Sequence, residues 1–423
     1  MKRLLIAIIG VFSCLHYEMH ADVVGSDSVV SVLPHYAFSA SPAVANRIAS
    51  FGWAQNGFSL ENSTTSVLFD SIYPVSGTIT LNNGTLNLNR DLIFNNPTTF
   101  TNFGTIVGNN HILSLSQSIV SIPANAPTFQ DTKIVLHNDV KLTGKTYFNG
   151  TCSIEGNGYT LTLGNAASII LNGQLLMHNV MLDGVAGNNV KCKNDSSLFI
   201  FDDVTWIQTD DFSMVVGAFQ CRNCVTFKGP HLFAYQTLKT SLIKANATLL
   251  LDHGFTFSYD PVRLASKTLL AFADSTASLV LNSATLCATT TGLNLTKGSL
   301  FVAGDSSLCS DVITNGTTII DNGITFGDGQ EANDFSCTVA TGARLSVTDG
   351  SVNYKNVLSS SWNMQNSLSM LNMGVGTILR LFATLDLGYG QTLCDDNVTI
   401  ARVSTAQILG NVSAVNNLFF EQM

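Results

Sequence analysis

LNLNRDLIFNNPTTFTNFGTIVGNNHILSL, residues 86–115, returns forty-eight positions later as IVLHNDVKLTGKTYFNGTCSIEGNGYTLTL, residues 134–163, with no gap in the alignment. Nine of the thirty positions are identical, and most other apolar positions keep an apolar residue. The identical pairs are Leu88/Leu136, Asp91/Asp139, Thr98/Thr146, Phe100/Phe148, Ile106/Ile154, Gly108/Gly156, Asn109/Asn157, Leu113/Leu161 and Leu115/Leu163. A fixed period marks an architecture built from repeated units.

Short segments in and around this repeat alternate apolar with polar residues, which predicts strands with one buried face. These segments are Thr78–Leu81, Thr85–Leu88, Ile112–Leu115 and Leu161–Leu163. Asn and Gly separate them, and both residues tolerate the positive φ angles of sharp corners. A looser unit, a small residue before an apolar-x-apolar strand, recurs at 168–171, 197–200, 248–251, 278–281, 299–302, 343–347 and 377–381.

One such unit cannot bury its apolar side chains alone, whereas a stack of units can. Coils about 4.8 Å apart pair their strands in parallel and place like side chains over like. The repeat would then be two coils of about 24 residues each. We predict an all-β fold, a single-stranded parallel β-helix (β-solenoid) of about 15 coils over residues 66–415, with a C-terminal tail at 416–423. Hairpin-rich β-sandwiches are the competing architecture.

The N-terminus, MKRLLIAIIGVFSCLHYEMHA, has a basic start, an apolar segment and a small residue at Ala21. This pattern predicts a signal peptide over residues 1–21 and a secreted or cell-surface protein. The alternative is a bacterial lipoprotein with its lipid on Cys14. Residues 22–65 are predicted to cap the solenoid, with a short helix from Ser41 to Phe51, because an open solenoid end exposes unpaired backbone. A disordered leader is the alternative.

Charged residues make up only 12% of the chain and hydrophobic residues 45%, against about 25% charged in ordinary soluble domains. No apolar run approaches the roughly 18 residues of a membrane-spanning helix, so we predict no transmembrane segment in the mature chain. Removal of residues 1–21 takes away Lys2, Arg3 and Glu18 and changes the net charge from −9 to −10. An acidic chain without a basic run predicts no nucleic-acid partner.

The run CSIEGNGYTLTL at residues 152–163, followed by the apolar strands 169–171, 175–177 and 180–184, resembles the pectin-lyase-like superfamily of right-handed parallel β-helices. This fold occurs in bacterial adhesin passengers and polymorphic surface proteins, and in polysaccharide lyases and hydrolases. The resemblance covers most of residues 66–415. It implies a fold and does not imply a chemistry.

Acidic pairs at Asp202–Asp203 and Asp210–Asp211 are the weak candidates for an acidic site. In the family that this chain resembles, galacturonan hydrolases combine clustered Asp residues with Gly-His-Gly and Arg-Ile-Lys motifs, so the resemblance directs attention to these motifs. Here His253, in Asp-His-Gly, is the nearest match to the first motif, and the second is absent. Neighbouring strand residues point to opposite faces, so neither Asp pair is by itself a catalytic dyad. We interpret them as turn and surface residues and predict no catalytic residue, no cofactor and no metal site.

Two cysteine pairs are candidate disulfides in a secreted chain. Cys221 and Cys224 form a lone C-x-x-C, which lacks the second pair of a zinc site. Cys287 and Cys309 each follow Leu, at a spacing close to one coil, so stacked coils would bring their Cα atoms within disulfide range at about 4.8 Å. The alternative is that these thiols act as small hydrophobic side chains.

These features together predict a non-enzymatic secreted or surface-exposed protein. A long, flat face of Thr, Ser and Asn would bind a host surface or a glycan, or the protein would serve as an envelope scaffold. The alternative is a polysaccharide lyase or glycoside hydrolase of the pectin-lyase-like fold. The sequence leaves the ligand and the oligomeric state open.

Overall fold

A computed structural model of the chain describes backbone and side chains for residues 79–94, 103–116, 127–164, 166–258, 270–287, 297–304, 306–308, 370–382 and 384–423 apart from 386, 388 and 404, and the backbone of further short strands. Every regular element in these parts is a β-strand, and they contain no helix long and apolar enough to cross a membrane. The chain divides into two compact units, unit 1 (1–184 and 189–193) and unit 2 (185–188 and 194–423). The predicted signal peptide and Cys14 lie outside the described residues.

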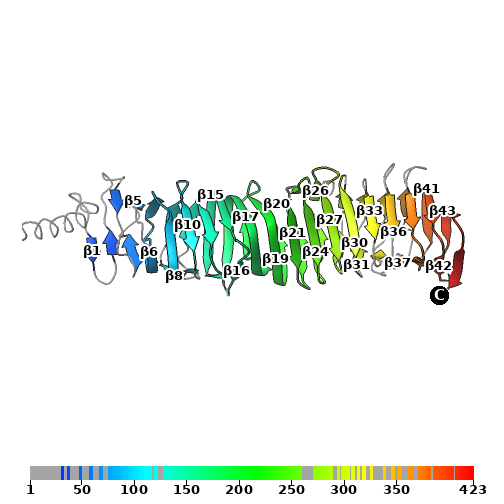
Figure 1. Cartoon of the computed structure of the whole chain (residues 1–423), viewed down its shortest axis with the longest axis horizontal. Helices are drawn as coiled ribbons and strands as arrows, with labels where there is room; N and C mark the ends of the chain where they lie inside the picture. Colours follow the sequence, from blue (N-terminus) through cyan, green and yellow to red (C-terminus); the bar gives the residue numbers. More distant parts are fainter. Residues whose placement is uncertain are drawn as a thin grey trace, which may run out of the picture. The chain divides into compact units, whose positions relative to one another are not determined.

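Unit 1 contains strands β1 to β18 (Figure 1), except the last three residues of β17, 185–187, which belong to unit 2. Their bounds are β1 Val30–Val32, β2 Tyr36–Phe38, β3 Arg47–Ala49, β4 Gly57–Leu60, β5 Ser66–Phe69, β6 Val75–Thr80, β7 Thr85–Leu88, β8 Leu92–Thr101, β9 Gly104–Val107, β10 Ile112–Leu115, β11 Ile119–Ser121, β12 Pro127–Gln130, β13 Lys133–Leu136, β14 Val140–Thr143, β15 Lys145–Glu155, β16 Thr160–Leu163, β17 Ser168–Gly187 and β18 Val190–Cys192.

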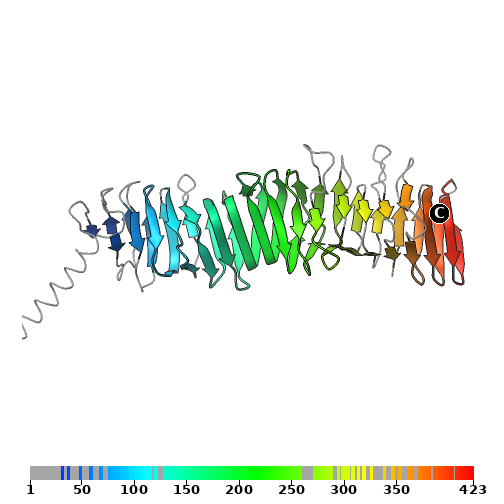
Figure 2. The ribbon, with the colours of Figure 1, turned by 90° about the horizontal axis from the view of Figure 1, so that it is seen from above.

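Unit 2 contains strands β19 to β44, which lie side by side when seen from above (Figure 2, green to red). Their bounds are β19 Leu198–Met214, β20 Ala218–Arg222, β21 Cys224–Lys228, β22 Leu232–Tyr235, β23 Ser241–Ile243, β24 Thr248–Asp252, β25 Thr256–Tyr259, β26 Leu270–Phe272, β27 Ser278–Asn282, β28 Thr285–Ala288, β29 Leu293–Leu295, β30 Ser299–Ala303, β31 Ser306–Cys309, β32 Val312–Thr314, β33 Thr317–Ile320, β34 Ile324–Phe326, β35 Cys337–Val339, β36 Arg344–Val347, β37 Ser351–Tyr354, β38 Ser361–Met364, β39 Met370–Met373, β40 Ile378–Leu381, β41 Leu385–Cys394, β42 Val398–Arg402, β43 Ile408–Ala414 and β44 Leu418–Gln422.

Each coil of unit 1 has three sides, and each side is a parallel ladder that continues in the next coil. Buried apolar residues lie opposite one another along each ladder and fill the interior. The ladders run through Ile106, Phe129 and Phe148; through Leu113, Ile134 and Ile154; and through Val140 and Leu161. The predicted parallel β-solenoid is therefore confirmed.

The internal repeat does not correspond to two coils, as the sequence analysis predicted. Leu113 lies opposite Ile134 in the next coil, and Ile134 lies opposite Ile154 in the coil after that. Two coils after Leu113 the chain has therefore reached only Ile154, and its repeat partner Leu161 is one side further along. Leu161 consequently lies on a different side, opposite Val140. The two copies of the repeat therefore occupy different sides of the coil, and each copy consists of strands with the corners between them.

The corner residues shared by the two copies bond to the neighbouring coil. In the first copy, Asp91 Oδ1 accepts a hydrogen bond from the Ile112 N–H at 2.8 Å, and Asn109 Nδ2 donates to the Leu88 carbonyl at 3.1 Å. The second copy makes the same two bonds, from the Thr160 N–H to Asp139 at 2.8 Å and from Asn157 to the Leu136 carbonyl at 2.9 Å. These side chains satisfy strand-end backbone groups that would otherwise lack a partner.

Unit 2 is built in the same way around an aromatic core. Its three ladders include Cys221, Ile243 and Phe272; Leu249, Leu279 and Leu300; and Phe233, Phe257, Leu286 and Leu308. The predicted strands at 248–251, 278–281 and 299–302 are confirmed, and their first residues stack in register. Thr248 Oγ1 and Ser278 Oγ are 2.8 Å apart within this stack.

Three details differ from the prediction. The strands stack in about 11 turns, fewer than 15. The coils are also not uniform, since the coil from Leu249 to Leu279 is longer than the coil from Leu113 to Ile134. Arg47–Ala49, assigned to a helix, is strand β3 and pairs with β5. Residues 418–422, assigned to a tail, form β44 and pair in parallel with β42. The rest of the predicted cap over 22–65 lies largely outside the described residues.

Candidate functional site

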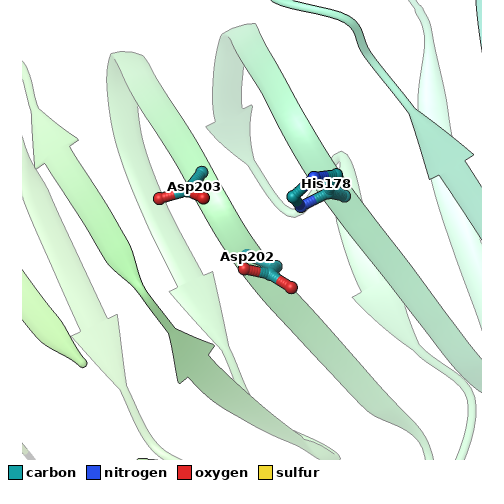
Figure 3. A group of neighbouring side chains, drawn as sticks. All are labelled: His178, Asp202 and Asp203. Carbon is teal, nitrogen blue, oxygen red and sulfur yellow. The ribbon is translucent and has the colours of Figure 1, made fainter. Parts of the chain in front are cut away.

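Asp202 and Asp203 lie on β19, where the chain turns a corner of the coil (Figure 3). Asp203 has a φ of 53°, and this turn corrects the expectation that the two side chains point to opposite faces. Asn223 Nδ2 donates to Asp202 Oδ1 at 2.6 Å and to Asp203 Oδ2 at 3.3 Å. Asp203 Oδ1 also accepts from the Cys224 N–H at 3.1 Å, at the start of β21.

This geometry gives the Asp202–Asp203 pair a structural role in joining coils. Glycoside hydrolysis needs an acid and a base about 5–9.5 Å apart on the two sides of one bond. Two carboxylates that share one amide donor cannot flank a sugar in this way. Asp202 and Asp203 therefore lie at a turn on the surface, which agrees with their interpretation as turn and surface residues.

Asp210 and Asp211 form a second corner, beside His231. One ligand atom from each of the three residues lies within 4.8 Å of the others, a donor set that suits a divalent transition metal. Each carboxylate also has a backbone partner, since Asp210 Oδ1 accepts from the Asp211 N–H at 2.8 Å and Asp211 Oδ1 from the Leu232 N–H at 2.9 Å. Two surface carboxylates that already accept backbone hydrogen bonds, together with one imidazole, do not establish a metal site. The absence of a metal therefore stays a prediction.

His253 lies at a further corner, with a φ of 55°. Its Nδ1 contacts the carboxylate of Asp252, which is largely buried, while the imidazole itself is 74% exposed. Asp252 Oδ1 accepts from the His253 N–H at 3.0 Å and from Asn282 Nδ2 at 2.8 Å. The carboxylate thus holds two coils together, as Asp203 does. The structure does not bring His253 together with either Asp pair.

Cys221 and Cys224 are not brought together. Cys221 is fully buried in the interior and Cys224 is exposed, and both are free thiols. Burial raises the pKa of the Cys221 thiol well above its usual range, which keeps it protonated and inert. The C-x-x-C motif places Cys221 inside the coil and Cys224 on its outer surface, so the predicted disulfide between the two cysteines is not made in this structure.

Cys287 and Cys309 occupy opposite positions on neighbouring coils, in β28 and β31. Their spacing in the sequence therefore predicted their register correctly. In-register positions on parallel strands are about 4.8 Å apart, inside the Cα range of disulfides. A disulfide between these two cysteines stays a prediction.

The sequence analysis missed a group of lysines around Tyr147 in unit 1. We call the outward positions Lys145, Tyr147, Lys191 and Lys193, with Ile170 between them, the lysine face. Tyr147, Ile170 and Lys191 lie in register on β15, β17 and β18. The Lys193 Nζ atom lies 5.2 Å from the centre of the Tyr147 ring, within cation–π range.

The lysine face was hidden in the sequence because its two pairs of residues lie far apart in the chain. Alternation places Lys145 and Tyr147 on one side of β15, and the same rule places Lys191 on β18 and Lys193, the residue directly after it, on one side. Only the register of the coils shows that these two pairs share a face.

No known protein-family model, curated protein or solved structure matches this chain at a significant level.

Proposed function

We propose that this protein is a secreted or surface-exposed, non-enzymatic β-helix that binds a glycan or another component of a host surface, or serves as an envelope scaffold. The proposal includes cleavage of a signal peptide at residues 1–21 and membership of the pectin-lyase-like superfamily. The single observation that carries it is the regular outer surface, on which uncharged polar side chains lie in register from coil to coil.

Two examples show this regularity. Thr85, Thr105 and Thr128 lie opposite one another on β7, β9 and β12, and a second row runs through Thr248, Ser278 and Ser299. Hydroxyl groups repeated at the coil spacing of about 4.8 Å form a flat, hydrated surface that can hydrogen-bond a repeating ligand. The Asp residues at the three candidate corners meanwhile bond to neighbouring coils, which gives their position a structural reason.

The alternative is a polysaccharide lyase or glycoside hydrolase. It would rest on Asp210, Asp211 and His231, a corner of unit 2 where two carboxylates and an imidazole converge. Asp→Asn variants test this alternative cleanly, because Asn keeps an oxygen that can accept the Leu232 N–H bond.

A paired binding and digestion assay separates the two functions. We expect the purified chain to bind at least one glycan on an array saturably and to release no new reducing or unsaturated ends from uronan polysaccharides. Cleavage at ordinary enzymatic rates, about 1 s⁻¹ or faster, that is lost in D210N/D211N would overturn the non-enzymatic function. The D202N/D203N variant is the matched control for that loss.

A further inference from the structure

We propose that the lysine face of unit 1 binds an acidic polysaccharide, with Lys191, Lys193 and Lys145 contacting its carboxylate or sulfate groups. This inference rests on the proposed glycan-binding function and adds the ligand class and the site. Its basis is the position of five outward residues, the three lysines with Tyr147 and Ile170, on three consecutive coils.

Charge is distributed unevenly along the chain. Residues 79–193 contain six Lys and Arg against five Asp and Glu, a net charge of +1, whereas residues 194–423 contain eleven against nineteen, a net charge of −8. Three of the six basic residues in the first stretch belong to the lysine face. The segments that form this face, 145–149, 168–172 and 190–193, contain no acidic residue.

The lysines are spaced to contact several groups of one polymer. Lys191 lies on β18 and Lys193 directly follows this strand, where its N–H still bonds to the Leu171 carbonyl at 2.8 Å, so their Cα atoms are about 6.6 Å apart. Lys145 lies two coils away, about 9.6 Å along the stack. Lys145 and Lys193 are exposed and Lys191 is half-buried. A linear polymer with acidic groups on successive sugars would meet three ammonium groups at once.

Tyr147 and Ile170 form the floor of the face. Ile170 points outward between Tyr147 and Lys191, yet its side chain is only 5% exposed. Neighbouring side chains therefore cover its apolar surface. The Tyr147 ring attracts the Lys193 ammonium and limits its freedom. A pre-positioned charge loses less entropy when it binds an anion. Asn149 and Asn172, in register with each other at the edge of the face, can hydrogen-bond sugar hydroxyls.

The acidity of the whole chain does not prevent this binding. At physiological ionic strength the Debye length is about 8 Å, so charges further away are largely screened. Two acidic residues border the face: Asp195 follows Lys193 by two residues, and Asp131 lies on the coil before Gly150 and accepts the Thr151 N–H bond at 2.8 Å. The three lysines outnumber these two carboxylates, so the charge of the face and its borders is positive.

The test compares three double variants of the full chain on immobilised heparin, polygalacturonate and neutral dextran. K191Q/K193Q is expected to weaken binding to both acidic polymers at least tenfold, and K191R/K193R to retain it. K133Q/K141Q removes the same charge from β13 and β14 on the other two sides and is expected to leave binding within twofold. Equal unfolding midpoints by circular dichroism show that each variant is folded.

Each outcome decides the proposal. Equal weakening in K191Q/K193Q and K133Q/K141Q would show an effect of net charge alone and would overturn the assigned site. Saturable binding to dextran but not to the acidic polymers would reject the acidic ligand and leave the general glycan-binding function standing. A chain that bound no glycan of either kind would count against both.

Discussion

Replacing Phe233 by alanine is expected to lower the free energy of unfolding by about 3–5 kcal/mol, the range for a large aromatic residue removed from a packed core. Phe233 is only 1% exposed. Its ring centre lies within 6.3 Å of seven other aromatic rings of unit 2, which belong to Trp206, Phe212, Phe219, Phe227, Tyr235, Phe255 and Phe257. A cavity there cannot close without moving rings on three ladders. Urea unfolding followed by circular dichroism gives the measurement.

Two controls separate this core effect from the loss of an aromatic residue in general. Phe233→Leu keeps most of the volume and is expected to cost about 1.5 kcal/mol or less. Tyr389→Ala removes a ring that is 79% exposed and is expected to change stability by less than about 0.5 kcal/mol. Equal stability of the Phe233→Ala and Tyr389→Ala variants would contradict an aromatic interior in unit 2.

Replacing Gly156 by alanine is expected to destabilise unit 1 by about 3 kcal/mol through overpacking. Gly156 is identical in both copies of the repeat, where Gly108 is its partner. A Cβ atom at Gly156 would lie 2.4 Å from the Asn179 carbonyl oxygen and 2.4 Å from the Val180 Cβ. Both contacts are with the next coil, and the first is with backbone, so the coils would have to separate. Thermal or urea unfolding measures the loss.

Gly158, two residues further on, is the matched control. It has a φ of 82°, and a Cβ atom there would meet no other atom within 4 Å. Gly158→Ala therefore carries only the strain of a left-handed backbone, about 1–2 kcal/mol. If the Gly158→Ala variant were the less stable of the two, close contact between coils at Gly156 would be wrong.

Local residue patterns predicted the strands well. Strands β7 and β10 have the bounds read from alternation alone, because a strand with one buried face must alternate. Stacking was also predictable, and the register of Cys287 with Cys309 followed from their spacing. Asn and Gly correctly marked the corners, since many corner Asn residues, including Asn109 and Asn157, have positive φ.

The length of a coil could not be predicted in the same way. The period of the internal repeat shows only that the chain has passed a whole number of sides between the two copies. The sequence does not show how many sides make one coil, so the period does not give the length of a coil. The in-register pair Leu113 and Ile134 resolves this, because it sets the coil length directly in this part of unit 1. The uniform coil inferred from half of the repeat was an average over sides and loops of different lengths.

The candidate sites show the same distinction between features of the local sequence and contacts between coils. The acidic corners were visible in the sequence, but their role was not, because each bond joins residues a whole coil apart, as between Asp203 and Cys224. The lysine face needed the register of three coils, so spacing along the chain gave no signal for it. Local chemistry was therefore readable from the sequence, and convergence between coils was not.

Thiol cross-linking between neighbouring coils tests the central claim most directly. Ser114 lies opposite Val135 in β10 and β13, whereas a coil equal to half of the internal repeat would place Asn138 over Ser114. With a short bifunctional thiol reagent and mass spectrometry of linked peptides, S114C/V135C is expected to cross-link efficiently and S114C/N138C poorly. Efficient linkage of S114C/N138C without linkage of S114C/V135C would contradict the three-sided parallel stack.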